Sequence, residues 1–133
     1  MKNFSKVLAL AITLTLPLIS QVSAQDKGLS LKDNMKQSAI ILKQITASIN
    51  DASKNQDNAA LVAKMSVFME AARLQSPDSV TNGSLADYQA LLDQEIRNLK
   101  DLQSAFLKND NAAALSILQK ITSVKKEGHD KYK

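Results

Sequence analysis

The sequence has no cysteine and no tryptophan, and its 133 residues include only one histidine, three glycines and two prolines. The lack of cysteine excludes disulfides, zinc ribbons, iron–sulfur clusters and thiol nucleophiles. A phosphate-cradling glycine loop, a nucleophile elbow, an EF-hand loop and a His-Glu-x-x-His helix each require residues that are also missing. Hydrolytic catalysis is therefore not expected, and any metal site must use histidine, methionine or carboxylate ligands.

Charge is nearly balanced along the chain, with 17 Lys and Arg against 13 Asp and Glu. The chain has no dense cluster of Lys and Arg residues, so the sequence does not indicate binding to a nucleic acid or to a membrane surface. Hydrophobic residues make up 44% of the chain and aromatic residues only 4%. We therefore expect one domain with an apolar core, and the shortage of strand-forming residues disfavours an all-β fold.

The first 24 residues have the pattern of an export signal. Two lysines provide a positive start, an apolar run covers residues 7–19, and small residues precede a predicted cleavage after Ala24. The apolar run is shorter than the ~20 residues that a membrane-spanning helix needs. We therefore expect a signal peptide over residues 1–24, a mature domain over residues 25–133, and no membrane anchor after cleavage.

Apolar residues recur with a helical period in four segments of the mature chain. The stripes with this period cover residues 31–49, 61–72, 85–106 and 115–132. Short polar stretches separate the segments, and connections of this length make consecutive helices antiparallel neighbours. The sequence therefore predicts an all-α fold, an antiparallel up-down-up-down four-helix bundle.

Helix starts are predicted where asparagine and aspartate can accept the free backbone N–H groups of a first turn. Asp57 or Asn58 is expected to cap the second helix, and residues 108–111 offer caps for the fourth. The second helix should end before Pro77, whose ring cannot donate to the helical ladder. The third helix should begin near Leu85.

Met35 and His129 are the candidate site residues that this topology brings together. Three reversals return the chain to the pole where it began, so the start of the first helix and the end of the fourth meet there. Both residues fall on the predicted apolar stripes, close to these helix ends. Imidazole nitrogen and thioether sulfur are soft neutral donors, and such a pair can hold haem iron in an electron-transfer site.

A porphyrin between the helices would also need apolar walls, and basic groups for its propionates. The candidate walls are Leu31, Tyr88, Leu92 and Val124, and the candidate basic groups are Lys125, Lys131 and Lys133.

Several of these residues also have a plainer interpretation. Met35 can be core packing, His129 can interact with the helix C-terminus, and Lys125 can be a snorkelling side chain. Met65 and Met69 could form a copper-type thioether pair, but they are interpreted as core because no histidine is expected near them. If the plainer interpretations hold, the protein is a haem-free exported helical bundle that functions by binding other proteins or as a stress protein.

Both ends of the mature chain resemble those of the cytochrome b562 family. The segment Leu31–Met35 (LKDNM) is similar to the family's opening, which carries a methionine ligand of haem iron. Residues 128–133 (GHDKYK) are similar to the family's ending, which carries the histidine ligand. Residues 57–60 (DNAA) and the region of Met69 match the second helix, and residues 85–133 run alongside the family pattern without a gap.

The resemblance implies that Met35 and His129 are the axial ligands of one non-covalent haem b. Tyr88 falls where the family has a phenylalanine beside the haem, and Lys125 falls where it has an arginine near the histidine ligand. The resemblance further implies a periplasmic electron carrier rather than an enzyme, passing single electrons to redox partner proteins. We expect a monomer.

The chain departs from the family pattern around this site. Between Met35 and Asn58 it has about two extra helical turns, and between Met69 and Tyr88 it is shorter by a similar length. Gly128 replaces an aromatic residue beside the histidine, and glycine loosens the last turn by ~1 kcal/mol relative to alanine.

Overall fold

The computed structural model describes residues 28–80 and 84–132, so the predicted signal peptide lies outside the described residues. The described part forms helices and no strand, which confirms the predicted all-α class and is consistent with a four-helix bundle. None of the described helices is long and apolar enough to cross a bilayer. In chain order the elements are α2 (Leu31–Ser48), η1 (a 3-10 helix, Ala52–Lys54), α3 (Asn55–Arg73), α4 (Leu85–Leu107) and α5 (Asn111–Lys131).

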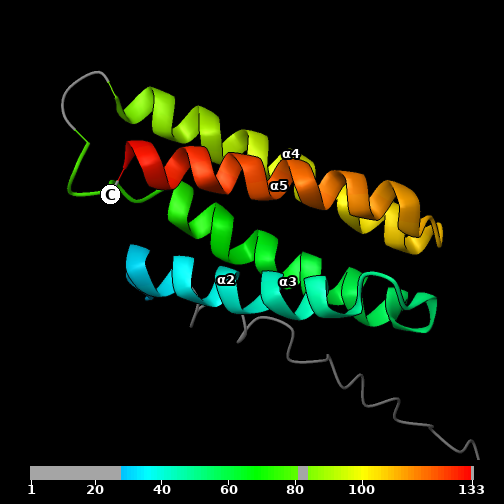
Figure 1. Cartoon of the computed structure of the whole chain (residues 1–133). Helices are drawn as coiled ribbons and strands as arrows, with labels where there is room; N and C mark the ends of the chain where they lie inside the picture. Colours follow the sequence, from blue (N-terminus) through cyan, green and yellow to red (C-terminus); the bar gives the residue numbers. More distant parts are fainter. Residues whose placement is uncertain (1–27, 81–83, 133) are drawn as a thin grey trace, which may run out of the picture.

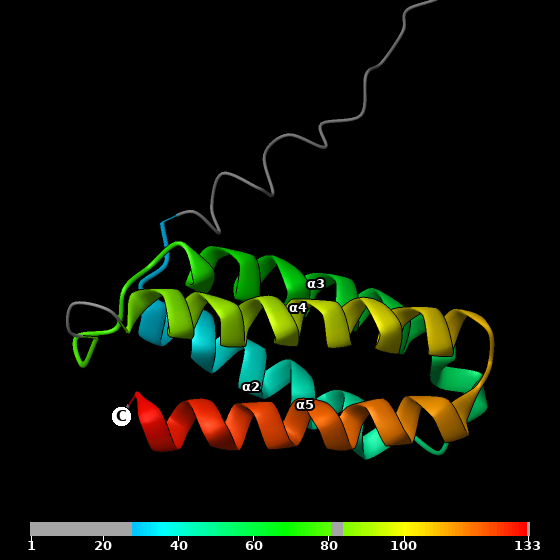
Figure 2. The ribbon, with the colours of Figure 1, turned by 90° about the horizontal axis from the view of Figure 1, so that it is seen from above.

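The α-helices lie side by side (Figure 1, Figure 2). Packing is most extensive between neighbours in chain order, α2 with α3, α3 with α4, and α4 with α5. Within the described residues, α2 and α5 make no comparably extensive contact with each other. The start of α2, the end of α3, the start of α4 and the end of α5 lie at one end of the bundle, called the site pole. The opposite end, which holds η1 and the α4–α5 connection, is called the η1 pole.

Capping side chains set the starts of α2 and α5. Ser30 Oγ accepts the Asp33 backbone N–H at 3.1 Å, and Asp110 Oδ1 accepts the Ala113 backbone N–H at 3.0 Å. The predicted starts of α4 and α5 and the predicted end of α3 are confirmed.

The prediction that Asp57 or Asn58 caps α3 is wrong. α3 begins at Asn55, because η1 leads directly into it. This 3-10 turn is itself capped by Asp51, whose Oδ1 accepts the Ser53 backbone N–H at 3.0 Å. Asn58 is buried in the first turns of α3, where its side-chain oxygen accepts a serine hydroxyl of α2 at 2.8 Å.

The core is built from the apolar stripes of all four α-helices. Three apolar residues of the predicted stripes do not join it, since Ile40 is 44%, Leu85 is 38% and Leu115 is 41% exposed. Ile41, which was also predicted on the α2 stripe, is buried, so this stripe is narrower than predicted only on the side of Ile40. On α5 the residue before Leu115, Ala114, is buried, so the α5 stripe starts one residue earlier. The largest fully buried apolar side chains are Phe106, Ile45, Leu99, Leu102, Ile121 and Val62.

Buried amides connect the helices at the η1 pole. Asn55, 1% exposed, donates to the Oδ1 atoms of Asn109 and Asn111 at 3.1 and 2.9 Å. Asn111 donates to Asn55 Oδ1 at 3.0 Å and to the Ile49 carbonyl at 2.9 Å. Asn109 has a φ of 54°, a left-handed conformation that asparagine tolerates better than most residues. This network connects the end of α2, the start of α3 and the α4–α5 turn.

A second set of amide hydrogen bonds connects α2 to the end of α3 at the site pole. Asn34 is fully buried and donates to Gln75 Oε1 at 3.0 Å, while Gln75 Nε2 donates to the Leu29 carbonyl at 2.8 Å. A satisfied buried hydrogen bond contributes ~1 kcal/mol, and losing one partner costs more than that. Polar side chains therefore hold both poles in addition to the apolar packing between them.

Asn111→Ala should lower the free energy of unfolding by ~1–3 kcal/mol, because the Ile49 carbonyl and the buried Asn55 amide each lose a partner. Asn50→Ala is the control, because Asn50 is exposed in the same region and its loss should cost less than ~0.5 kcal/mol. Urea unfolding followed by circular dichroism measures both values. Equal effects of the two substitutions would show that the amide network does not stabilise the η1 pole.

Candidate functional site

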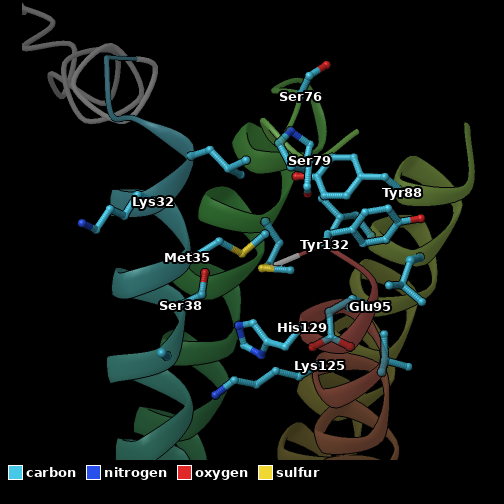
Figure 3. A pocket seen from close by; sticks show the side chains of 18 of the residues that line it. Lys32, Met35, Ser38, Ser76, Ser79, Tyr88, Glu95, Lys125, His129 and Tyr132 are labelled. Carbon is cyan, nitrogen blue, oxygen red and sulfur yellow. The ribbon is translucent and has the colours of Figure 1, made fainter. Parts of the chain in front are cut away.

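A pocket of about 760 Å³ lies at the site pole and is lined from both α2 and α5 (Figure 3). All four α-helices contribute to the lining, as does the segment 76–79 that follows α3. The lining is mainly apolar. It includes all four side chains predicted as walls, Leu31, Tyr88, Leu92 and Val124.

Met35 and His129 line this pocket from α2 and from α5 (Figure 3). Met35 is half-buried, and His129 is exposed. Within the described residues, no hydrogen bond or ion pair engages the imidazole or the thioether. The structure therefore brings both predicted donors to one cavity with their donor atoms available, and their role as ligands stays a prediction.

Tyr88 forms a buried part of the pocket wall and is 3% exposed. Its hydroxyl donates to the Ala72 carbonyl at 2.8 Å, and its ring meets the Tyr132 ring edge-on with centroids 5.5 Å apart. Burial raises the pKa of Tyr88 to about 12, so the hydroxyl keeps its proton at neutral pH. Tyr88 thus fixes α4 against the end of α3 and supports Tyr132 at the pocket edge.

Among the predicted basic groups, Lys125 lines the pocket and Lys131 does not. The Lys131 side chain lies on the exposed surface of α5, where Nζ donates to Glu127 Oε1 at 2.7 Å, and its role as a partner of the propionates stays a prediction. Lys133 lies outside the described residues. Lys32 was not predicted from the sequence but lines the pocket mouth, with its ammonium group directed away from the cavity (Figure 3).

Met65 and Met69 are buried core residues, as predicted, but they line the same pocket as His129. The expectation that no histidine lies near them is therefore wrong, because the pocket reaches deep enough to meet α3. Together with Met35, the cavity has three thioethers and one imidazole, a donor set that suits Cu(I) as well as haem iron. Among the described residues, no group of three or more His, Cys, Asp or Glu side chains could hold a metal ion.

Glu95 is a second pocket residue that was not predicted from the sequence. It is 3% exposed on α4, lines the cavity near Lys125 and His129 (Figure 3), and its Oε2 atom has no hydrogen-bond partner. Burial raises the pKa of Glu95 to about 8, although the positive charge of Lys125 acts in the opposite direction. The carboxyl group is therefore mostly protonated at neutral pH. Ser38 of α2 also lines the pocket with a buried, unpartnered hydroxyl.

The spacing of α4 contains the signal for Glu95. Buried residues on one face of a helix are spaced by alternating steps of four and three residues. On α4 these steps lead from Leu92 to position 95 and from there to Leu99, so the spacing predicts a buried residue at position 95. The stripe comprises Tyr88, Leu92, Glu95, Leu99, Leu102 and Phe106.

Gly128 lies where α5 approaches α4 at the pocket. A Cβ atom on residue 128 would lie 3.1 Å from Leu91 Cδ2, closer than an ordinary van der Waals contact. The Leu91 side chain therefore takes the space that a larger residue before His129 would need. The small size of Gly128, next to His129, is therefore explained by its packing against Leu91.

Glu95→Gln should stabilise the protein at alkaline pH. The ordinary pKa of this carboxyl is 4.5, and in the folded protein it is about 8, so folding favours the protonated form. The contribution of the Glu95 carboxyl to the free energy of unfolding is therefore fully present below pH 4.5, and it is lost as the pH rises through about 8.

Urea unfolding at about pH 5 and about pH 9 measures this effect, and the gain from Glu95→Gln should be larger at the higher pH by ~2 kcal/mol or more. Asp101→Asn removes an exposed carboxylate from the same helix and should give the same difference at both pH values. A gain from Glu95→Gln that does not depend on pH would contradict the assignment.

The family model described as Cytochrome b562 matches residues 30–133 of the chain. The matched range contains every described helix and every residue that lines the pocket. Searches of the curated proteins and of the solved structures found no match. Because the family match covers most of the chain, this protein belongs to the cytochrome b562 family of haem-binding electron carriers.

Proposed function

We propose that this protein is a periplasmic b-type cytochrome that binds one non-covalent haem per chain and carries single electrons between redox proteins. The signal peptide is removed near Ala24, and the mature chain acts as a monomer without catalysing a reaction of its own. Met35 and His129 are the proposed axial ligands, with Tyr88 and Lys125 as further haem contacts. The observation that carries the proposal is that the His129 imidazole and the Met35 thioether line a single apolar pocket.

The size and lining of the pocket fit a haem. Ligand pockets commonly have volumes of ~300–1,000 Å³ and mostly apolar walls. The cavity of about 760 Å³ falls in this range, and Tyr88 and Leu92 of α4 and Val124 of α5 supply much of its wall. Since the chain has no cysteine, a haem would be held without a covalent bond to a cysteine side chain.

The polar atoms of the pocket also fit such a ligand. Ser38 Oγ and Glu95 Oε2 are buried without partners, and native proteins seldom leave such atoms unsatisfied unless a ligand or water meets them. Burial keeps Glu95 mostly protonated at neutral pH, so it does not repel the anionic propionates of a haem. Lys125 supplies a positive charge in the same cavity.

Bound haem supplies an iron that takes up and releases one electron. The chain holds the group and sets its reduction potential through ligand identity and burial. His129 offers an imidazole nitrogen, which binds iron well in both oxidation states. Met35 offers a thioether, which favours ferrous iron and so raises the potential.

The proposed architecture is the antiparallel up-down-up-down bundle. It is supported by the colours of Figure 1, which run in alternating directions along successive helices, and by connections that alternate between the two poles. This topology brings the start of the first helix beside the end of the last one.

Titration with haemin tests the cofactor. The wild-type protein should bind about one haemin per chain, melt at a higher temperature when loaded, and release the haem to acidified organic solvent. His129→Ala should lose most of the affinity, because the imidazole ligates iron in both oxidation states. Asp130→Ala changes the exposed neighbour and should bind as the wild type does. A wild-type protein that takes up no haemin would favour the haem-free interaction or stress protein instead.

Separate alanine substitutions of Met35, Met65 and Met69 identify the thioether ligand. Met65→Ala and Met69→Ala should each lower stability by ~2–5 kcal/mol, because both side chains are buried in the core, and Met35→Ala should cost less, because Met35 is half-buried. Only Met35→Ala should also turn the ferric protein high-spin and lower its reduction potential, since only this change opens a coordination position. Absorption spectra and redox titration of the three loaded variants decide the assignment, and a wild-type spectrum and potential in Met35→Ala would refute it.

A further inference from the structure

Charge is distributed unevenly over the four α-helices. α2 carries three lysines against one acidic residue, and α5 carries four lysines against two acidic residues. α3 is balanced, with two charges of each sign, whereas α4 carries four acidic residues against two basic ones. The pocket lined by Met35 and His129 therefore lies between the two helices that have an excess of positive charge.

The lysines of α2 form a row along the pocket mouth. Lys32, Lys36 and Lys43 are separated by four and seven residues, so they share one face of the helix. Lys32 lines the pocket, which places this face at the pocket edge. Lys36 and Lys43 are exposed and do not line the cavity.

Lys126 extends the positive charge to the other side of the mouth. It is exposed on α5, one turn before His129, which lines the pocket. Residues three apart are neighbours on a helix surface, so Lys126 lies beside the candidate ligand. The charge of Glu127, the next residue, is matched by its ion pair with Lys131.

An exposed apolar side chain lies within the same surface. Ile40 is 44% exposed, and it follows Lys36 by four residues and precedes Lys43 by three. Protein interfaces commonly combine an apolar centre with a polar rim, and this arrangement places an apolar contact between two cations.

We propose that the surface formed by Lys36, Ile40, Lys43 and Lys126, called the basic rim, is the docking surface for an acidic redox protein. The inference rests on the proposed function, because the partner would exchange electrons with a haem held in the pocket that the rim borders. Complementary charge steers such an encounter and orients it, so the negative partner meets this edge of the bundle and not the acidic α4. Lys32 and Lys125 are not assigned to the rim, because they line the pocket itself.

The test uses the haem-loaded double variant Lys36→Glu/Lys126→Glu. Its matched control is Lys64→Glu/Lys100→Glu, which changes the net charge equally at exposed positions of α3 and α4. Stopped-flow absorption measures the rate at which each ferric protein is reduced by reduced plant-type ferredoxin, an acidic protein, and by hexaammineruthenium(II), a cationic complex. At low salt, the rim variant should react at least about threefold more slowly with ferredoxin and faster with the ruthenium complex. The control should differ less, and about 0.5 M salt should remove the difference.

Two results would overturn the docking surface. One is an equal change in both variants, because the rate would then follow net charge and not the rim. The other is an unchanged ferredoxin rate together with rim-dependent pelleting on phosphatidylglycerol vesicles, because the rim would then bind a membrane. The haem spectrum of every protein is recorded before mixing, so a failure to bind haem, which contradicts the proposed function, is distinguished from a failure of docking.

Discussion

Each helix of this bundle must bury one apolar stripe, and the closure of four stripes around one core is the constraint on which the rest of the structure depends. Large side chains such as Phe106 and Leu99 are fully buried and fill the core between the helices. Toward the site pole, the stripes of α2 and α5 continue with Met35 and His129, which line an open space instead of closing it. The pocket is therefore a part of the core that the chain's own side chains do not fill, held in shape by the amides of Asn34 and Gln75 and by Tyr88.

Much of this arrangement could be predicted from the sequence because it follows from local spacing. Helical periodicity predicts the four helices and assigns Met35 and His129 to the same pole, since helix faces and chain reversals do not depend on distant contacts. The start of α3 could not be predicted in this way. It depends on a 3-10 turn that Asp51 caps, and apolar spacing carries no information about such a turn.

The deeper residues of the site escaped prediction for a different reason. The proximity of Met65 and Met69 to His129 depends on how far the pocket extends, which is a property of the assembled bundle. Glu95 was overlooked because a helical glutamate is usually solvated, and burying one costs stability unless it is protonated or paired. Such departures from local rules concentrate where a protein has a function to perform, and both cases fall within the pocket.

The contact between Leu91 and the backbone at Gly128 links two residues that are far apart in the chain. Because a Cβ atom on residue 128 would lie 3.1 Å from Leu91 Cδ2, a larger residue at position 128 requires the Leu91 side chain to give way. A lineage that acquired a larger residue before the histidine would have to move or shrink the Leu91 side chain, or accept a shift of the last turn of α5. Sizes at these two positions should therefore vary in opposite directions during evolution, so that this pair of helices diverges in sequence while the spacing around His129 is preserved.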